Sequence, residues 1–272
     1  MPPPKNTMEI FRLLDQSNCR QCGKKTCLAF AGAVFTGQKR LAECPRLDRE
    51  TVQLFAKDSP PGPAAEDDGE RRVEALTEKI AGIDLEAAAR RAGGRFSRNR
   101  LVLKVMGKDV SIDPHGNFYT DIHVNPWIAV PYLLYVLHGK GLAVSGNWVP
   151  FRELTGGKER YPLFRKRCET AIKRLADHYP GLFQDIVDIF NGRHVTKQFE
   201  ADISVILHPF PKVPIMMCYW LPEDGMASSF SLFFDETVNQ NLEIDATFTL
   251  GTGLARMFEQ LAVRHGFSLS NT

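Results

Sequence analysis

The sequence predicts an α+β protein in which a small, mostly helical domain is linked to a larger α+β domain with antiparallel strands. Three observations lead to this prediction. Four of the six cysteines lie within residues 19–44. Residues 58–70 are rich in proline, glycine and acidic side chains and show no apolar periodicity, which is typical of a linker. Beyond them, strand-like and helix-like segments occur in separate blocks, which favours the α+β class over a doubly wound sheet.

These observations divide the chain into three parts. We expect a cysteine-bearing domain over residues 1–57, a linker over 58–70 and an α+β domain over 71–272. The total length of 272 residues is enough for two unequal domains.

The first domain is expected to contain three short helices. Asn6, with Glu9 three residues later, predicts a capping box at the start of the first helix. Thr26 and Asp48 are good N-cap residues for the second and third helices. The helices expected here cover residues 8–14, 26–38 and 48–56.

The larger domain is expected to begin with a helix over residues 70–92, interrupted near Gly82 and stopped by two glycines. Strands over 101–106 and 110–113 are joined by the turn "GKD". Three segments rich in β-branched and aromatic residues predict buried antiparallel strands. These segments are 201–210, 213–221 and 227–235. Further helices are expected over 126–138, 162–178 and 246–265.

Composition excludes several classes of protein. A net charge of +2 gives no support for nucleic-acid binding. No apolar run reaches the roughly 18 residues that span a bilayer, so we expect no membrane insertion. The first residues, "MPPPKNTMEIF", do not resemble a secretory signal, so we expect a cytoplasmic protein whose thiols are reduced. Residues 1–57 carry ten basic and five acidic side chains, so the cysteine-bearing domain is the basic one.

Cys19, Cys22, Cys27 and Cys44 have the spacing C-x2-C-x4-C-x16-C, and Pro45 follows the last. A set of four thiolates suits either a zinc ion or an iron–sulfur cluster, and disulfides are a third alternative. Zinc sites of four cysteines usually consist of two C-x2-C pairs, whereas this sequence has one. Three close cysteines and a distant fourth before proline favour a 4Fe–4S cluster. Cys27 in the first turn of a helix, with lysines and arginines around it, would lie in the positive potential that suits an anionic cluster.

The stretch "NCRQCGKKTCLAFAGAVFTGQKRLAECPRL" resembles the N-terminal cluster domain of the large subunit of the corrinoid iron–sulfur protein of the acetyl-CoA pathway. It is also similar to the cluster domain of Rnf-type membrane electron-transfer complexes. The resemblance covers residues 7–57 and implies that the four cysteines hold a 4Fe–4S cluster. In the corrinoid protein this domain passes an electron to a cobalamin in the Co(II) state, which implies anaerobic metabolism. The corrinoid-binding barrel of that protein does not match this chain.

From about residue 72 onward the chain resembles an uncharacterised domain family that often follows this cluster motif. The stretches that carry the resemblance are "GNWVPFRELTGG", "HPFPKVPIMMCYW" and "FSLFFDETVNQNL". That family implies no activity.

"DIHVNP" contains half of the D-x-H-x-x-G motif whose histidine binds cobalt beneath a corrinoid. His123 is therefore a candidate cofactor ligand, oriented by Asp121. Proline replaces the glycine of the motif, and no βαβ unit surrounds it. The alternative is a loop in which Asp121 or Asn125 caps the next helix, with Pro126 at its first position.

Cys168 and Cys218 are the remaining cysteines. Basic neighbours could lower the pKa of Cys168 and make it nucleophilic. The alternative for both residues is simple burial, because cysteine is among the residue types most often buried. His194 and His208 are isolated histidines, for which structural or solvent-facing roles are usual.

Three functions are compatible with the sequence. The first is low-potential electron transfer, to a partner protein or to a cofactor such as a corrinoid or another tetrapyrrole bound by the larger domain. The partner would be a ferredoxin-like donor or a corrinoid protein. The second is a redox enzyme with its active site in the larger domain, although no constellation of nucleophile, base and oxyanion donors is present. The third is a binding protein that senses oxygen or redox state through its cluster.

Overall fold

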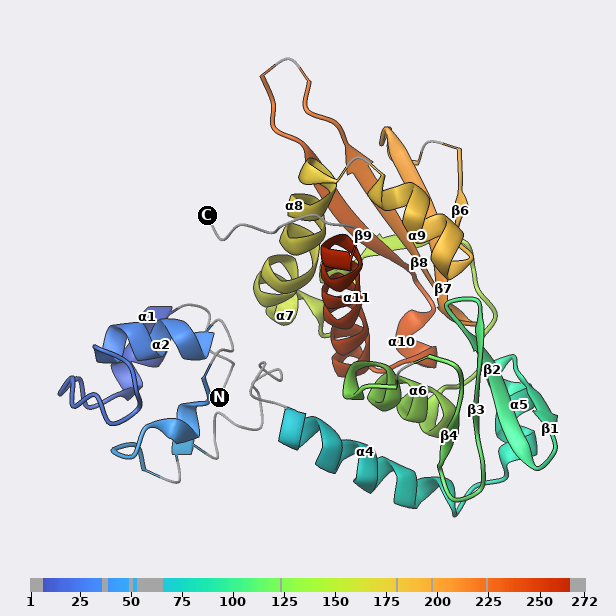
Figure 1. Cartoon of the computed structure of the whole chain (residues 1–272), viewed down its shortest axis with the longest axis horizontal. Coiled ribbons are helices and arrows are strands. Elements are labelled where there is room, and N and C mark those ends of the chain that lie inside the picture. The colour runs from blue at the N-terminus through green and yellow to red at the C-terminus, as the bar shows by residue number, and fades with distance from the viewer. Residues whose placement is uncertain are drawn as a thin grey trace. The chain divides into compact units, whose positions relative to one another are not determined.

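The computed structural model describes residues 7–35, 39–48, 51–52, 66–122, 124–179, 181–196, 198–223 and 225–264. The chain forms two compact units, Met1–Arg71 and Arg72–Thr272, and each is considered by itself (Figure 1). Of the predicted linker, residues 58–65 lie outside the described part, whereas residues 66–70 are helical. Acidic residues are favoured at a helix N-terminus, so the composition of this stretch also suits the start of a helix.

Residues 7–48 of the first unit, as far as they are described, form two helices that pack against each other and one turn of 3₁₀ helix. The helices are α1 (Thr7–Leu13) and α2 (Cys27–Phe35), and the turn is η1 (Leu41–Glu43). Thr26 caps α2 as predicted, because its hydroxyl accepts a hydrogen bond from the Ala29 N–H at 3.0 Å. The buried residues of this unit are Ile10, Leu14, Cys27, Phe30, Ala31 and Cys44.

Two predictions in the first unit fall partly outside the described residues. Asn6, proposed to open the first helix, is not among them. Of the third helix only Thr51 and Val52 are described, and both are helical. The Asp48 carboxylate accepts hydrogen bonds from the Thr51 N–H at 2.7 Å and its hydroxyl at 2.6 Å, as expected of an N-cap.

The break predicted near Gly82 separates two helices, α4 (Glu66–Ile80) and α5 (Leu85–Ala92). Asp84 caps α5 by accepting bonds from two backbone N–H groups of the first turn. Gly93, with a φ of 75°, ends the helix in the left-handed conformation that glycine adopts most easily.

A four-stranded antiparallel sheet follows, with the order β1-β2-β3-β4. Its central pair was predicted; the outer strands were not, because they are only two or three residues long. The strands are β1 (Arg95–Ser97), β2 (Arg100–Val105), β3 (Lys108–Ile112) and β4 (Phe118–Tyr119).

The second sheet has five antiparallel strands in the order β5-β9-β8-β7-β6. The three long central strands are those predicted from aromatic and β-branched content. The strands are β5 (Trp148–Pro150), β6 (Arg193–His194), β7 (Ile203–Phe210), β8 (Val213–Trp220) and β9 (Ser229–Asp235). Ile215 pairs with Phe234 and Met216 with Phe233, so successive residues supply two different apolar faces.

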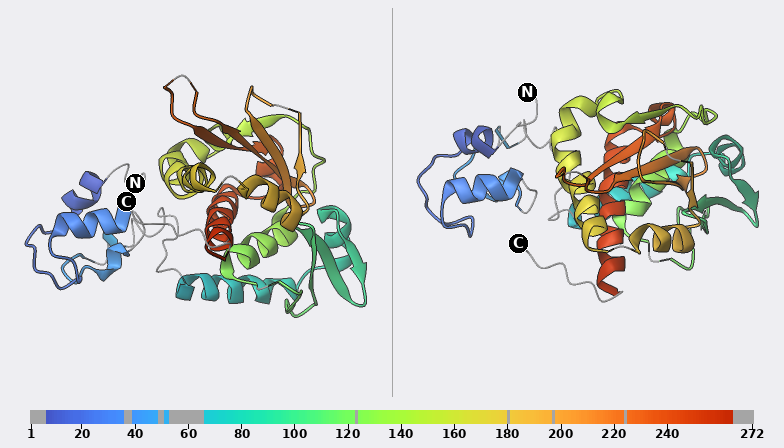
Figure 2. Two further views of the ribbon diagram at one scale, coloured as in Figure 1. Left: turned by 45° about the horizontal axis from the view of Figure 1, so that its top comes forward. Right: turned by 90° about the horizontal axis from the view of Figure 1, so that it is seen from above.

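One face of this sheet belongs to the main core, which helices cover. α11 runs through the middle of the larger unit and contacts both α6 and α8 (Figures 1 and 2). The α-helices are α6 (Pro126–His138), α7 (Gly157–Phe164), α8 (Thr170–His178), α9 (Leu182–Phe190), α10 (Val238–Asn241) and α11 (Ile244–Arg264). A 3₁₀ turn, η2 (Phe151–Glu153), precedes α7, and a π-helical turn, η3 (Arg165–Glu169), joins α7 to α8.

Close packing in this core leaves no room at one glycine of α11. The rings of Phe151 and Phe164 stack with centroids 3.9 Å apart and planes 5° apart. A Cβ atom at Gly251 would lie 2.6 Å from a ring carbon of Phe164, so a glycine is needed where α11 crosses this pair.

Residues 195–196 and 198–202, which we call the strap, lie on the other face of the sheet, where Val195 and Ala201 join a small apolar cluster with Met216 and Phe233. Phe199 stacks on Phe233 at 4.3 Å while remaining 50% exposed, and its carbonyl accepts a hydrogen bond from the Trp220 indole at 3.2 Å. Phe199 and Glu200 both have left-handed backbone conformations, with φ of 52° and 57°. Such a conformation is rare for residues other than glycine, so the strap covers this face at some conformational cost.

Among the described residues, no helix combines the length and apolar character needed to cross a bilayer.

Candidate metal centre

The four clustered cysteines all belong to the first unit. Cys19 and Cys22 lie on the loop between α1 and α2, Cys27 is the first residue of α2, and Cys44 directly follows η1. Cys27 and Cys44 are buried, and the other two are partly buried. All four are free thiols. The predicted position of Cys27 in the first helical turn is confirmed.

The loop that carries Cys19 and Cys22 turns repeatedly. Gln16, Asn18, Arg20 and Gly23 have φ values of 57°, 51°, 63° and 75°, all left-handed. Left-handed residues that alternate with ordinary ones direct successive backbone N–H groups into one concavity, which is a known way of binding phosphates and iron–sulfur clusters. The loop therefore has a backbone suited to an anionic group.

Asn18 connects this loop to the start of α2. Its side-chain oxygen accepts a hydrogen bond from the Cys27 N–H at 2.7 Å, and its own N–H donates to the Cys27 sulfur at 3.3 Å. The first bond satisfies a backbone N–H that a helix N-terminus leaves without a partner. The second places an N–H group against one of the sulfurs. Asn18 was not predicted as a site residue. It lies nine residues before Cys27, and no local pattern in the sequence indicates that the two residues make contact.

Cys44 is positioned by a short capped turn. The Cys44 N–H donates to the Leu41 carbonyl at 3.1 Å, which closes η1. The Glu43 carboxylate accepts a hydrogen bond from the Arg40 N–H at 2.7 Å and forms an ion pair with the Lys39 ammonium at 2.6 Å. These contacts fix the turn that presents Cys44 to the small core.

A second link joins the Cys44 segment to the loop. The Arg46 guanidinium lies 3.3 Å from the Asp15 carboxylate, which also accepts bonds from the Ser17 N–H and hydroxyl. The Ser17 amide is the main reason that the pKa of Asp15 lies below its usual value. Because Asp15 begins the loop and Arg46 follows Cys44, this pair brings the two cysteine-bearing segments together.

Burial raises the pKa of the Cys44 thiol above its usual value. The Arg46 backbone N–H opposes this effect, while the negative charges of Asp15, Cys22 and Cys19 add to it. The thiols are therefore close enough for their charges to interact. Ionised together, they need a compensating positive group between them.

The structure brings three of these cysteines into one cluster but does not place them at metal-ligand distances. Cys22, Cys27 and Cys44 belong to one apolar cluster around α1 and α2. Across the described part of the chain, however, no three Cys, His, Asp or Glu side chains approach closely enough to hold a metal ion together. Their role as ligands therefore remains a prediction. The donor set fits an iron–sulfur cluster, because the four thiols are free and partly or fully buried, and amide N–H groups face two of the sulfurs.

His123, the candidate corrinoid ligand, lies outside the described residues. The predicted alternative role of its neighbours is confirmed for Asn125, whose side-chain oxygen accepts bonds from the Trp127 and Ile128 N–H groups, with Pro126 at the first position of α6. The Asp121 side chain is exposed.

The other candidates lie in the larger unit. Cys168 and Cys218 are fully buried, as the simpler interpretation predicted. Burial raises the pKa of Cys168 well above its usual value, so the basic neighbours do not make it a thiolate. His194 is exposed and faces Gln184 at 3.4 Å. His208 lines a groove that is described below.

Two family models match the chain, one within each of the two compact units. Residues 84–257 match a family model described as "Domain of unknown function (DUF3786)". Residues 14–46 match a model described as "Putative Fe-S cluster", and this segment contains all four clustered cysteines. An iron–sulfur cluster segment thus precedes the larger domain.

Curated relatives match a short stretch of the chain, 48 residues in one case and 59 in another. The chain is 39% identical over 59 residues to the corrinoid/iron-sulfur protein large subunit of Moorella thermoacetica, a match that covers 21% of this chain and 13% of that protein. It is 35% identical over 48 residues to the acetyl-CoA decarbonylase/synthase complex subunit gamma of Methanopyrus kandleri, covering 18% of this chain and 10% of that subunit. The chain therefore spans about a tenth of the length of the curated relatives it matches. No solved structure is significantly similar to it.

Proposed function

The chain belongs to the family described as "Domain of unknown function (DUF3786)", with an iron–sulfur cluster segment ahead of that domain, and we propose that it is a low-potential electron-transfer protein. In this proposal residues 1–57 hold one 4Fe–4S cluster, residues 58–70 link the parts, and residues 71–272 bind the partner or cofactor that exchanges electrons with the cluster.

The observation that carries the proposal is the surroundings of the four thiols. All four are free, three of them (Cys22, Cys27 and Cys44) belong to one small core, and amide N–H groups face the sulfurs of Cys27 and Cys44. Hydrogen bonds to cluster sulfurs and burial are the means by which proteins set the potential of such a cofactor.

When bound, a 4Fe–4S cluster accepts and releases single electrons. The residues of this chain would hold it with four thiolates and stabilise its negative charge. The Asn18 N–H and the Cys27 helix start supply partial positive charge. Lys24 and Lys25, on the loop immediately before α2, add full charges. These groups favour the more negative, reduced state.

Two kinds of redox partner, which give an electron to the cluster or accept one from it, are consistent with the relatives. One is a partner protein, either a ferredoxin-like donor or a corrinoid protein, since the matched relatives are named as subunits of complexes and as a corrinoid protein. The other is a corrinoid or another tetrapyrrole bound by the larger domain, with His123 as its axial ligand. The corrinoid in both ideas comes from the name of a protein that this chain matches over 59 residues.

Electron paramagnetic resonance tests the proposal. The protein is purified without oxygen, its spectrum is recorded before and after reduction with dithionite, and variants are compared. Cys27→Ser and Cys44→Ser are expected to lose the signal of the reduced cubane, because each removes a predicted ligand. Cys218→Ala is the matched control, since it removes a buried cysteine of the larger unit. A wild-type protein with no reducible signal, or a signal equally lost in the control, would contradict the proposal.

A further inference from the structure

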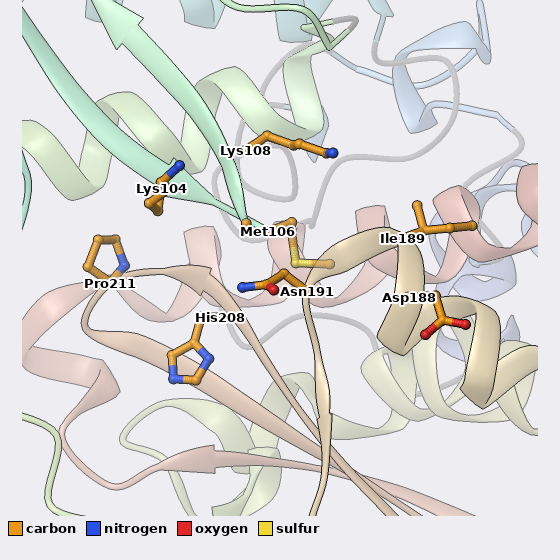
Figure 3. A pocket seen from close by; sticks show the side chains of 9 residues that line it. Lys104, Met106, Lys108, Asp188, Ile189, Asn191, His208 and Pro211 are labelled. Atoms are coloured by element: carbon orange, nitrogen blue, oxygen red, sulfur yellow. The ribbon is translucent and has the colours of Figure 1, made fainter.

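A groove of about 420 Å³ opens in the larger unit where three elements meet (Figure 3). One wall is the turn between β2 and β3, the second is the C-terminal end of α9, and the third is the end of β7 with the turn that follows it. This volume falls in the range of roughly 300–1,000 Å³ that small-molecule sites occupy. None of the four clustered cysteines lines this groove.

The turn between β2 and β3 is held in an unusual conformation. Its two residues, Met106 and Gly107, are both left-handed, with φ of 49° and 79°. Methionine is a rare choice for such a position, which asparagine, aspartate or glycine normally fills. The Met106 N–H donates to the His208 carbonyl at 3.1 Å, so the turn is fastened to β7.

Asn191, at the end of α9, packs against this turn. It is the left-handed C-cap of the helix, with a φ of 52°. A Cβ atom at Gly107 would lie 2.5 Å from the Asn191 Cβ, so the turn and the helix end are in close contact. Strained residues other than glycine persist only where their surroundings impose them, and they concentrate at ligand sites. Met106 and Asn191 lie at the centre of the view in Figure 3.

His208 reaches the groove from an irregular part of its strand. The pairing of β7 with β8 shifts register between Leu207 and Phe210, and His208 and Pro209 occupy that shift. Bulges of this kind redirect a side chain and are frequent beside functional sites. The sequence contained a signal of this feature, since a proline inside a strand marks a bulge or an edge.

The charge of the lining is mainly positive. Lys104 and Lys108 come from the hairpin, and Asp188 of α9 is the single carboxylate among the lining residues. Lys104 pairs with Asp109 at 3.1 Å, but both side chains are about half exposed or more, so this pair contributes little stability and can be exchanged for a ligand. Lys108 makes no ion pair with any described residue. Met106 adds an apolar surface beside these cations.

We propose that this groove binds a small organic anion whose phosphate or carboxylate group contacts Lys104, Lys108 and His208 and whose apolar part contacts Met106. The site is independent of the cysteines and is not part of the proposed electron-transfer function. It gives the larger domain a small-molecule ligand of its own.

The affinity is expected to depend on pH. The charged group that acts on His208 is Arg193 on β6, and the other charged groups of the groove are the two lysines of the hairpin and Asp188 on α9. Burial, and secondarily the charge of Arg193, lowers the pKa of His208 below its usual value, so the imidazole is neutral near pH 7. A bound anion offsets the positive charges and raises that pKa, so binding takes up a proton. For a carboxylate, which stays ionised over this range, affinity is therefore expected to increase as pH falls from about 8 to about 6.

Isothermal titration of the full chain with phenyl phosphate tests the proposal, with benzoate and phenol as comparison probes. Phenyl phosphate is expected to bind saturably, and phenol, which has no anionic group, is expected not to. Benzoate distinguishes a general anion site from one specific for phosphate. Lys108→Ala is expected to weaken binding about tenfold, the effect of losing one charge-assisted hydrogen bond. Lys158→Ala, which removes an exposed lysine of α7, is the control and is expected to have no effect.

A second variant separates the site from nonspecific charge effects. His208→Gln is expected to abolish the dependence of benzoate affinity on pH between about 6 and 8, where benzoate itself stays ionised, while retaining binding at pH 8. The proposal is overturned if the wild type shows no saturable binding of either anion, or if Lys108→Ala and Lys158→Ala bind equally. It is also overturned if phenol binds as tightly as phenyl phosphate. None of these measurements requires iron in the protein.

Discussion

Asn18 and Cys27 are joined by two hydrogen bonds of opposite direction, one from the Cys27 N–H to the Asn18 side-chain oxygen at 2.7 Å and one from the Asn18 N–H to the Cys27 sulfur at 3.3 Å. This pair sets the position of the loop that carries Cys19 and Cys22 relative to the helix that begins at Cys27. It also requires a left-handed backbone at Asn18. Substitutions at residue 18 can remove the side-chain acceptor with or without disfavouring the left-handed backbone.

Asn18→Gly keeps the left-handed conformation and removes the side-chain acceptor, so it is expected to destabilise the first unit by about 1 kcal/mol, the net value of one hydrogen bond. Asn18→Ala removes the acceptor and also adds the cost of a left-handed alanine, about 1 kcal/mol more. Denaturant unfolding under anaerobic conditions measures both values. Equal stability of the two variants would show that the backbone conformation of residue 18 is not imposed by the fold.

The buried carboxyl of Glu169 predicts a dependence of stability on pH. It is 4% exposed and accepts bonds from the Leu232 N–H at 3.2 Å and the Tyr161 hydroxyl at 3.0 Å. Burial raises its pKa above the usual value despite these bonds. An acid whose pKa is raised by folding contributes stability that is present below its unfolded pKa and lost as pH rises through its folded pKa.

Glu169→Gln is therefore expected to raise the unfolding midpoint more at about pH 8 than at about pH 5, because the amide carries no charge to bury. Glu159→Gln, an exposed residue of α7, is the control and should shift the midpoint equally at both values. A Glu169→Gln variant that loses stability at alkaline pH would mean that the charged form is the one the fold prefers.

The strap makes a prediction about backbone strain. Glu200→Gly is expected to stabilise the larger unit by about 1 kcal/mol, because glycine adopts a φ of 57° without strain. Phe199→Ala is expected to destabilise it, because the ring that stacks on Phe233 at 4.3 Å is lost and the strain remains. Urea unfolding measures the change in the free energy of unfolding of each variant. A Glu200→Gly variant that is less stable than the wild type would refute this explanation of the strap.

The proposed tetrapyrrole predicts a spectroscopic change. Cobalamin or haem added to the anaerobically purified protein is expected to give sharp visible bands on top of the broad absorption of a cluster. His123→Ala should shift these bands if that residue is the axial ligand, whereas His115→Ala, in an exposed turn, should not. Spectra that do not distinguish the two variants would leave the loop before α6 with the capping function of Asn125 alone.

Features fixed by local chemistry were predictable from the sequence. Thr26 and Asn125 cap helices where their side chains suggested, and Gly82 separates two helices. The long central strands were recognisable from their apolar composition, and the burial of Cys168 and Cys218 from residue type.

Features fixed by tertiary contacts were not predictable. α9 was not identified, and the helix predicted over 162–178 begins at Gly157 and includes Pro162 and a π-helical turn. Short strands such as β4 and β6 contain only two residues, too few for a periodic pattern. The groove depends on a turn, a helix end and a bulge that lie far apart in the sequence, and no single segment contains its pattern.

If Cys19, Cys22, Cys27 and Cys44 hold an iron–sulfur cluster, the content of iron and acid-labile sulfide per chain shows it. The protein is isolated without oxygen, and iron, zinc and sulfide are measured in the same sample. We expect about four irons and four sulfides per chain in the wild type, and the loss of both in Cys44→Ser. A single zinc ion without sulfide, or a protein free of both metals whose cysteines are paired as disulfides, would contradict it.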